Sequence, residues 1–73
     1  MPQFLSEITK PGSFKIKNLM GNESTRLMEM GVLPGLSLQV IRKAPLGFPI
    51  EIKVRGILLT LREVEASCIE LEL

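Results

Sequence analysis

Apolar and polar residues alternate along several short stretches of the chain, and this alternation is typical of strands that bury one face. The stretches comprise residues 14–18, 36–41, 50–55, 57–61 and 69–73. The third is the most regular, and it predicts that its two isoleucines and its valine point inward. By the same reasoning Ile57 should point inward, while Glu70 and Glu72 should lie on a solvated face.

A short helical segment separates the first two stretches. Asn22 is an acceptable N-cap for it, and Leu27 begins its apolar face. Gly31 suits the left-handed position that ends many helices, where Val32 would close over Leu27. Residues 33–36, with Pro and then Gly in the middle, predict a type II turn that leads directly into a strand.

The remaining breaks in the pattern fall at Gly and Pro residues or at a polar segment. Residues 44–49 form a loop, Arg55 and Gly56 suit a tight reversal, and residues 62–67 suit one helical turn. Five short strands favour a closed or nearly closed barrel, because closure removes edges that so small a sheet could not otherwise protect. We therefore expect a mainly β fold: a small SH3-like barrel of about five strands, with a short helix between the first two strands and a short helical turn before the last.

The length of 73 residues and the net charge of +1 limit the class of protein. We expect a single domain over residues 1–73, because too few residues remain after one hydrophobic core is built to form a second core. The near-neutral charge argues against nucleic-acid binding, which needs clustered Lys and Arg. No stretch reaches the roughly 20 apolar residues of a membrane span, the start lacks signal-peptide features, and the single cysteine excludes an internal disulfide. We therefore expect a cytoplasmic protein.

Residue types that catalyse reactions or bind transition metals are scarce. The chain has no His and one Cys, which removes the commonest acid–base residue and every zinc or iron–sulfur spacing. Cys68 is interpreted as a small buried residue. Glu63 with Glu65 would belong to a turn, and Glu70 with Glu72 to a solvated strand face, rather than to catalytic pairs.

The methionines Met20, Met28 and Met30 are interpreted as core-filling residues rather than soft-metal ligands. We therefore expect that this protein is not an enzyme and that it has no catalytic residue, no metal site and no cofactor. By elimination, the chain is a binding or regulatory module that acts through its surface.

Residues 26–63, RLMEMGVLPGLSLQVIRKAPLGFPIEIKVRGILLTLRE, resemble the core of the FeoA family. The shared features, in the same order and spacing, are Arg-Leu, a Gly closing the helix, Pro-Gly, an alternating strand, Ala-Pro-Leu-Gly, Pro-Ile, a Gly-containing reversal and a Leu-Arg ending. The flanks SEITKPGSFKI and IELEL also fit, so the resemblance covers nearly the whole chain. Phe48 is a departure, because the family commonly has Asp or Gly before this Pro.

The resemblance implies a small cytosolic SH3-like protein that accompanies FeoB, a membrane permease for ferrous iron with a cytosolic GTP-binding domain. It implies regulation through binding this partner, with contact to the membrane only through the permease. A weak homo-oligomer is a further possibility. Similar barrels form the C-terminal domain of iron-dependent repressors, so the alternative is a stand-alone metal-responsive domain that binds a transition metal ion.

Two surfaces are candidates for contact with a partner. The residues are Leu46, Gly47 and Phe48 in the loop, and Arg26, Met28 and Glu29 on the helix. The loop residues would form an apolar tip held in place by the neighbouring prolines. In the alternative arrangement, Phe48 folds back over the barrel mouth and extends the core. Arg26 and Glu29, with Met28 if it lies outside the core, would form a mixed patch, unless their charges are simply solvated.

Overall fold

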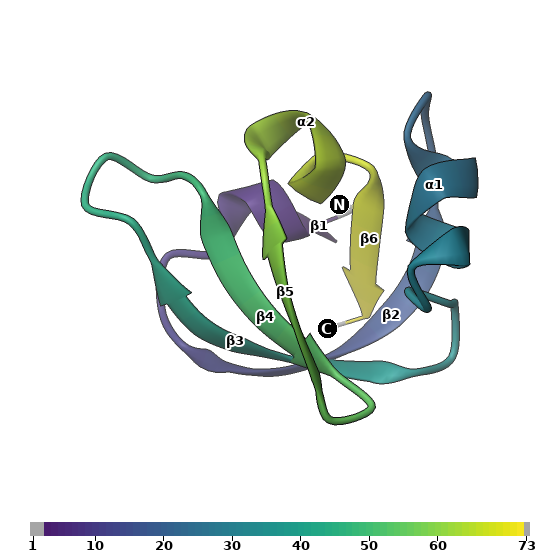
Figure 1. The fold of residues 1–73 in the computed structure, drawn as a ribbon, viewed down its shortest axis with the longest axis horizontal. Coiled ribbons are helices and arrows are strands. Elements are labelled where there is room, and N and C mark those ends of the chain that lie inside the picture. Colours follow the sequence, from purple (N-terminus) through teal and green to yellow (C-terminus); the bar gives the residue numbers. More distant parts are fainter. Residues whose placement is uncertain (1–2, 73) are drawn as a thin grey trace.

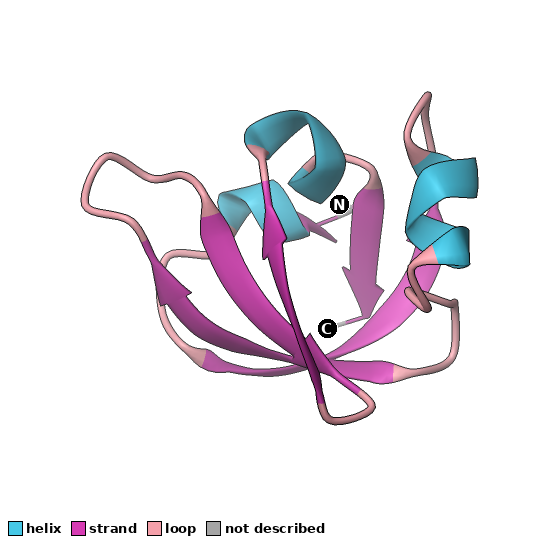
Figure 2. Ribbon diagram, in the orientation of Figure 1, coloured by secondary structure: helices cyan, strands magenta, loops and turns pink. Residues whose placement is uncertain are grey.

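One antiparallel sheet curls around the core, and short helices lie along its rims (Figures 1 and 2). The structure is a computed structural model that describes residues 3–72. Its strands are β1 (Gln3–Phe4), β2 (Gly12–Leu19), β3 (Ser37–Lys43), β4 (Ile50–Val54), β5 (Ile57–Leu61) and β6 (Ile69–Glu72). Its helices are the 3₁₀ helix η1 (Leu5–Glu7), α1 (Ser24–Glu29) and α2 (Glu63–Ala66). None of the helices within residues 3–72 has the length and apolar character that a membrane span requires.

The expected mainly β fold, with one inserted helix and a helical turn before the last strand, is confirmed, but the sheet differs from expectation in two ways. The described chain has six strands in the order β1-β6-β2-β3-β4-β5. The sixth, β1, is only two residues long and therefore too short to show an alternating pattern. The sheet is also open, because its end strands β1 and β5 do not pair with each other. The chain enters α2 directly after β5, and α2 contacts η1 instead.

The core is the inward face of this sheet, as the alternation predicts. All three inward residues of β4 are buried. The buried apolar residues are Leu5, Ile8, Ile16, Leu27, Val32, Leu38, Val40, Ile50, Ile52, Val54, Leu61, Ala66, Cys68, Ile69 and Leu71. The prediction for Ile57 is wrong: this side chain is 59% exposed, because it begins the end strand β5 beside a tight turn. Leu73, the last residue of the alternating stretch 69–73, lies outside the described residues.

The methionines fill the core less than expected. Met20 and Met28 are each 45% exposed, and Met30 is half-buried against the core. Helix α1 has only six residues and buries one of them, Leu27. A helix this short turns one narrow stripe toward the core, so Met28, the next residue after Leu27, faces solvent.

The C-terminal end of α1 is a Schellman motif, as the sequence predicts. The N–H of Val32 donates to the carbonyl of Leu27 (2.9 Å), and the N–H of Gly31 donates to the carbonyl of Met28 (3.0 Å). Gly31 has a φ of +94°, and Leu27 and Val32 are both fully buried. The motif therefore stops the helix and closes the core beneath it.

The N-terminal end of α1 differs from the prediction. Glu23, not Asn22, occupies the N-cap position, and no side chain caps the helix there. The Ser24 hydroxyl donates to the carbonyl of Gly21 (2.9 Å), as does its N–H (3.3 Å). Because these bonds close a turn over residues 21–24, Asn22 lies inside the turn rather than at the helix boundary.

Two predicted turns are present in the structure, one between α1 and β3 and one between β4 and β5. In residues 33–36, Gly35 has a φ of +92°, and the N–H of Leu36 donates to the carbonyl of Leu33 (3.2 Å). Arg55 and Gly56 both have positive φ, +54° and +81°, as a type I′ hairpin turn requires. This second turn joins β4 to β5 and sets their register.

Replacing Gly31 by Ala should lower the free energy of unfolding by about 1 kcal/mol. An added Cβ would meet nothing within 4 Å, so the cost comes only from the left-handed backbone. Thermal unfolding should therefore shift down by roughly 4–8 °C. The matched control is Gly12→Ala, because φ at Gly12 is not positive and the new Cβ would make an ordinary 3.4 Å contact with the Phe14 ring. Equal effects of the two substitutions would contradict the assignment of the cap.

Candidate partner-binding surfaces

The loop between β3 and β4, residues 44–49, holds Leu46 out in solvent. The N–H of Ala44 donates to the carbonyl of Pro49 (3.0 Å), and the N–H of Gly47 donates to the carbonyl of Ala44 (2.7 Å). Gly47 takes a φ of +106°, which allows the tight inner turn. Leu46 at the tip is 98% exposed. The loop therefore presents one leucine on a hydrogen-bonded support.

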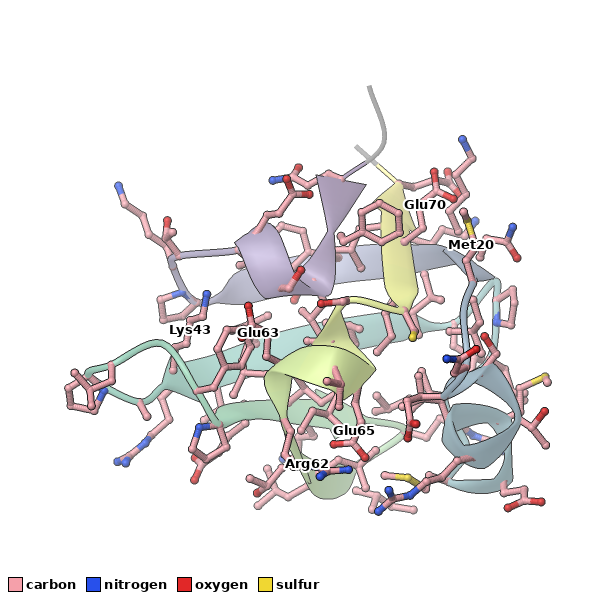
Figure 3. The ribbon with its side chains drawn as sticks, turned by 90° about the horizontal axis from the view of Figure 1, so that it is seen from above. Met20, Lys43, Arg62, Glu63, Glu65 and Glu70 are labelled. Atoms are coloured by element: carbon pink, nitrogen blue, oxygen red, sulfur yellow. The ribbon has the colours of Figure 1, made fainter. Side chains whose placement is uncertain are left out.

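Phe48 has a different position from Leu46, although it lies only two residues away. It is half-buried and packs against the core, and the Nζ of Lys43 lies 4.7 Å from the centroid of its ring. The same Nζ donates to the carbonyls of Ser6 (3.2 Å) and Ile8 (2.8 Å), so Lys43, labelled in Figure 3, reaches from β3 to η1 and the residue that follows it. Of the two arrangements considered for Phe48, the structure therefore has the folded-back one.

The outer face of α1 carries the second set of predicted residues. Met28 is 45% exposed and Glu29 is exposed beside it. The side chain of Arg26 is 57% exposed, with its Nη1 3.7 Å from Glu23 Oε1 and 3.4 Å from Glu65 Oε2. Arg26 is thus partly committed to contacts within the protein, and Met28 is the main apolar group on this face.

The two sets of residues do not form one surface. In Figure 1 the loop between β3 and β4 lies at one end of the molecule and α1 lies at the opposite end. The sheet separates them. A partner that binds one set therefore need not touch the other.

Glu65 links α2 to α1, a role that was not predicted from the sequence. Only 3% of the residue is exposed. Its Oε1 accepts a hydrogen bond from the N–H of Arg62 (2.8 Å) and lies 3.7 Å from Arg62 Nε; both residues are labelled in Figure 3. Its Oε2 faces Arg26 of α1. The available sequence signal was a glutamate at the third helical position, which often bonds back to the residue before the helix; Glu7 makes the same bond to the N–H of Phe4 (2.8 Å).

Glu70 was expected on a solvated face, and this prediction is wrong. The residue is only 8% exposed, because β6 lies between β1 and β2 and its neighbours cover both sides. Glu70 is opposite Phe4 on one strand and Asn18 on the other. Its Oε2 lies 3.8 Å from Lys17 Nζ, which provides the neighbouring positive charge.

Possible metal-donor side chains do not gather within residues 3–72: no three of the His, Cys, Asp and Glu type lie close enough to hold an ion. The Cys68 thiol is buried, as expected, and donates to the carbonyl of Val64 (3.3 Å). A Cβ added at Gly21 would stand 2.9 Å from its sulfur. Cys68 therefore fills space between the start of α1 and the end of α2.

An open, curled antiparallel sheet with a helix in its first long connection and a helical turn before its last strand places the protein in the SH3-like class. Within this class, the sequence matches the family described as FeoA domain over residues 4–73. The chain therefore belongs to the FeoA family.

Solved structures agree with this assignment. A FeoA-like protein from Clostridium acetobutylicum has a TM-score of 0.89 and 30% identity, covering 99% of this chain and 86% of that one. FeoA of Stenotrophomonas maltophilia complexed with zinc, described as an SH3 domain protein and a candidate ferrous iron transport activating factor, has a TM-score of 0.81 and 25% identity, covering 96% and 89%. The manganese regulator SloR shares the fold at 20% identity, with a TM-score of 0.80 over 94% of this chain and 33% of that one.

Replacing Glu65 by Ala should lower the free energy of unfolding by about 1–3 kcal/mol, because the N–H of Arg62 loses its cap and Arg26 loses its contact on α2. Glu65→Gln keeps an acceptor for that N–H and should lose less. The control is Glu63→Ala in the same helix, an exposed position where the change should stay within about 0.5 kcal/mol. Urea unfolding of the three variants measures these differences; an equal loss for Glu63→Ala and Glu65→Ala would contradict the linking role.

Proposed function

We propose that this protein is a cytoplasmic accessory regulator of ferrous iron uptake that binds the cytosolic part of a FeoB-type permease. Membership of the FeoA family supports the process, and the description of the Stenotrophomonas relative as a candidate transport activating factor supports an accessory role. In this proposal, the protein acts by contact and reaches the membrane only through its partner.

The observation that carries the proposal is the nearly complete exposure of the Leu46 side chain at the tip of its loop. Burying a fully exposed leucine contributes roughly 1.5–3 kcal/mol to binding. The loop is already closed by hydrogen bonds at Ala44 and Gly47, so little conformational entropy is lost when a partner covers it. We assign Leu46 and Gly47 to the contact surface, with the half-buried Phe48 as their support.

The outer face of α1 is the second candidate contact. Met28 would be its apolar centre, with Glu29 and the exposed part of Arg26 at its rim. Because α1 lies at the other end of the molecule from the loop, the two surfaces can be tested separately.

Leu46→Asp should weaken capture of a purified cytosolic FeoB domain by at least about tenfold, which corresponds to about 1.4 kcal/mol. The fold should be unchanged, since this side chain is 98% exposed. Phe48 is left intact, because it packs on the core. Binding is measured by calorimetry with the purified pair.

Val64→Asp on α2 is the matched control, since it makes the same change to Asp at an apolar residue that is 55% exposed elsewhere. Met28→Asp tests the face of α1 in the same assay. Full binding by Leu46→Asp would remove the loop from the proposal, and loss of binding only in Met28→Asp would move the contact to α1. No binding by the unsubstituted protein would overturn the proposed partner.

The alternative function, a stand-alone metal-responsive domain, is favoured by the fold that this chain shares with metal regulators such as SloR. The described residues do not supply a clustered set of ligands for it. Anaerobic titration calorimetry with ferrous or manganous ion separates the two functions: micromolar binding of either ion by this chain alone would favour the metal-responsive domain.

A further inference from the structure

Lys43 stands at the base of the loop between β3 and β4. It is the last residue of β3 and pairs with Ile50, the first residue of β4, so residues 44–49 begin directly after it. Arg42, the residue before it, faces the carboxylate of Glu51. The half-buried Lys43 instead directs its ammonium toward backbone carbonyls and an aromatic ring. Its charge is therefore used inside the molecule rather than at the surface.

The ammonium of Lys43 joins two parts of the chain that are far apart in the sequence. It donates to the carbonyls of Ser6 (3.2 Å) and Ile8 (2.8 Å), and it lies over the ring of Phe48, 4.7 Å from the centroid. Hydrogen bonds from a charged donor are roughly twice as strong as neutral ones, and the face of an aromatic ring attracts a cation. One charged group thus holds residues 3–8, called here the N-terminal segment, against the loop, and Figure 1 shows both on the same side of the molecule.

The N-terminal segment forms a compact unit. Glu7 Oε1 accepts from the N–H of Phe4 (2.8 Å), and the N–H of Ile8 donates to the carbonyl of Leu5 (3.1 Å). The two-residue strand β1 and the buried side chains of Leu5 and Ile8 attach the segment to the sheet. Because the segment is bonded within itself, the two carbonyls that bind Lys43 move together with η1.

The position of Leu46 depends on the backbone of the loop, because a side chain that is 98% exposed has almost no packing contacts of its own. Two hydrogen bonds shape that backbone, donated by the N–H groups of Ala44 and Gly47. Phe48 packs on the core and fixes the loop there, with the ammonium of Lys43 over its ring. Displacing the ammonium therefore loosens the support of the exposed leucine.

We propose that Lys43 is a positioning residue for the loop, and that it couples the docking of the N-terminal segment to the position in which Leu46 meets a partner. The partner is the one in the proposed function, on which the role of this coupling rests; the coupling itself belongs to the free protein. A coupling between two sites is reciprocal. A docked N-terminal segment therefore favours binding at the loop, and a partner bound at the loop stabilises the N-terminal segment.

The first test measures amide exchange in the free protein. Lys43→Met removes the ammonium and keeps an unbranched side chain of similar length, so exchange at the amides of Ala44 and Gly47 should become about tenfold faster. The amide of Val32, which bonds to the carbonyl of Leu27 at the end of α1, should not change.

Either of two results would overturn the positioning role. One is unchanged exchange at the loop amides in Lys43→Met. The other is an equal acceleration at Val32, because this would show a general loss of stability rather than a local loosening of the loop.

The second test measures the coupling. Glu7→Ala removes the carboxylate that accepts from the N–H of Phe4, which loosens the N-terminal segment from an exposed position. It should speed exchange at Gly47 several-fold when Lys43 is present, and have no effect in the Lys43→Met background. The control is Glu29→Ala, which removes an exposed glutamate on α1 and should leave Gly47 unchanged in both backgrounds. The same effect of Glu7→Ala in both backgrounds, including no effect, would contradict the coupling.

The third test adds the partner. Binding of the purified cytosolic FeoB domain should be several-fold weaker for Lys43→Met in calorimetry, and the bound domain should slow exchange at the amide of Ile8 in the unsubstituted protein only. Equal affinity of the two proteins would remove the positioning role at the contact surface. If the unsubstituted protein does not bind, the proposed function fails, whereas the coupling is still decided by exchange at Gly47.

Discussion

The structure depends on one constraint: a chain of 73 residues can bury only one face of its sheet. Strands β3 and β4 therefore turn alternate residues inward, and the polar groups that fall near the core must find partners there. The ammonium of Lys43 binds two backbone carbonyls beneath η1, and the carboxylate of Glu65 caps α2 while facing α1. Among the described residues, no buried side-chain nitrogen or oxygen lacks a hydrogen-bond partner. These polar contacts fasten the helices to a sheet that does not close by strand pairing.

Local sequence patterns predicted most of the sheet, because alternation, the left-handed Gly31 and the tight turn after β4 depend on a few neighbouring residues. They did not predict β1, which has two residues and exists only through its pairing with β6. That pairing is also the reason that Glu70 is buried, since the exposure of its strand face depends on a neighbour from the far end of the chain. Contacts between charged side chains and distant backbone groups follow no periodic pattern, so they cannot be predicted from the sequence in the way that the strands can.

The candidate surfaces show the same division between local and long-range effects. Leu46 could be recognised from its place between turn residues, and it is exposed on a loop closed by its own hydrogen bonds. Phe48 could not be assigned from sequence, because its position depends on Lys43 and on the core beneath it. Arg26 and Glu29 were correctly expected at the surface, whereas Met28 was expected in the core and is exposed. The engagement of Arg26 with Glu65 required the arrangement of α1 and α2. The protein thus offers separate apolar contacts on a small rigid support.

The pairing of β1 with β6 has a practical consequence for how this domain can be handled. Gln3 lies directly opposite Leu71, so the polypeptide enters and leaves the fold on neighbouring strands, away from the loop that carries Leu46. Domains whose ends lie close together tolerate insertion into a host protein or rejoining at a new break point. This domain could therefore be grafted through short linkers into a reporter, with its leucine tip still facing outward.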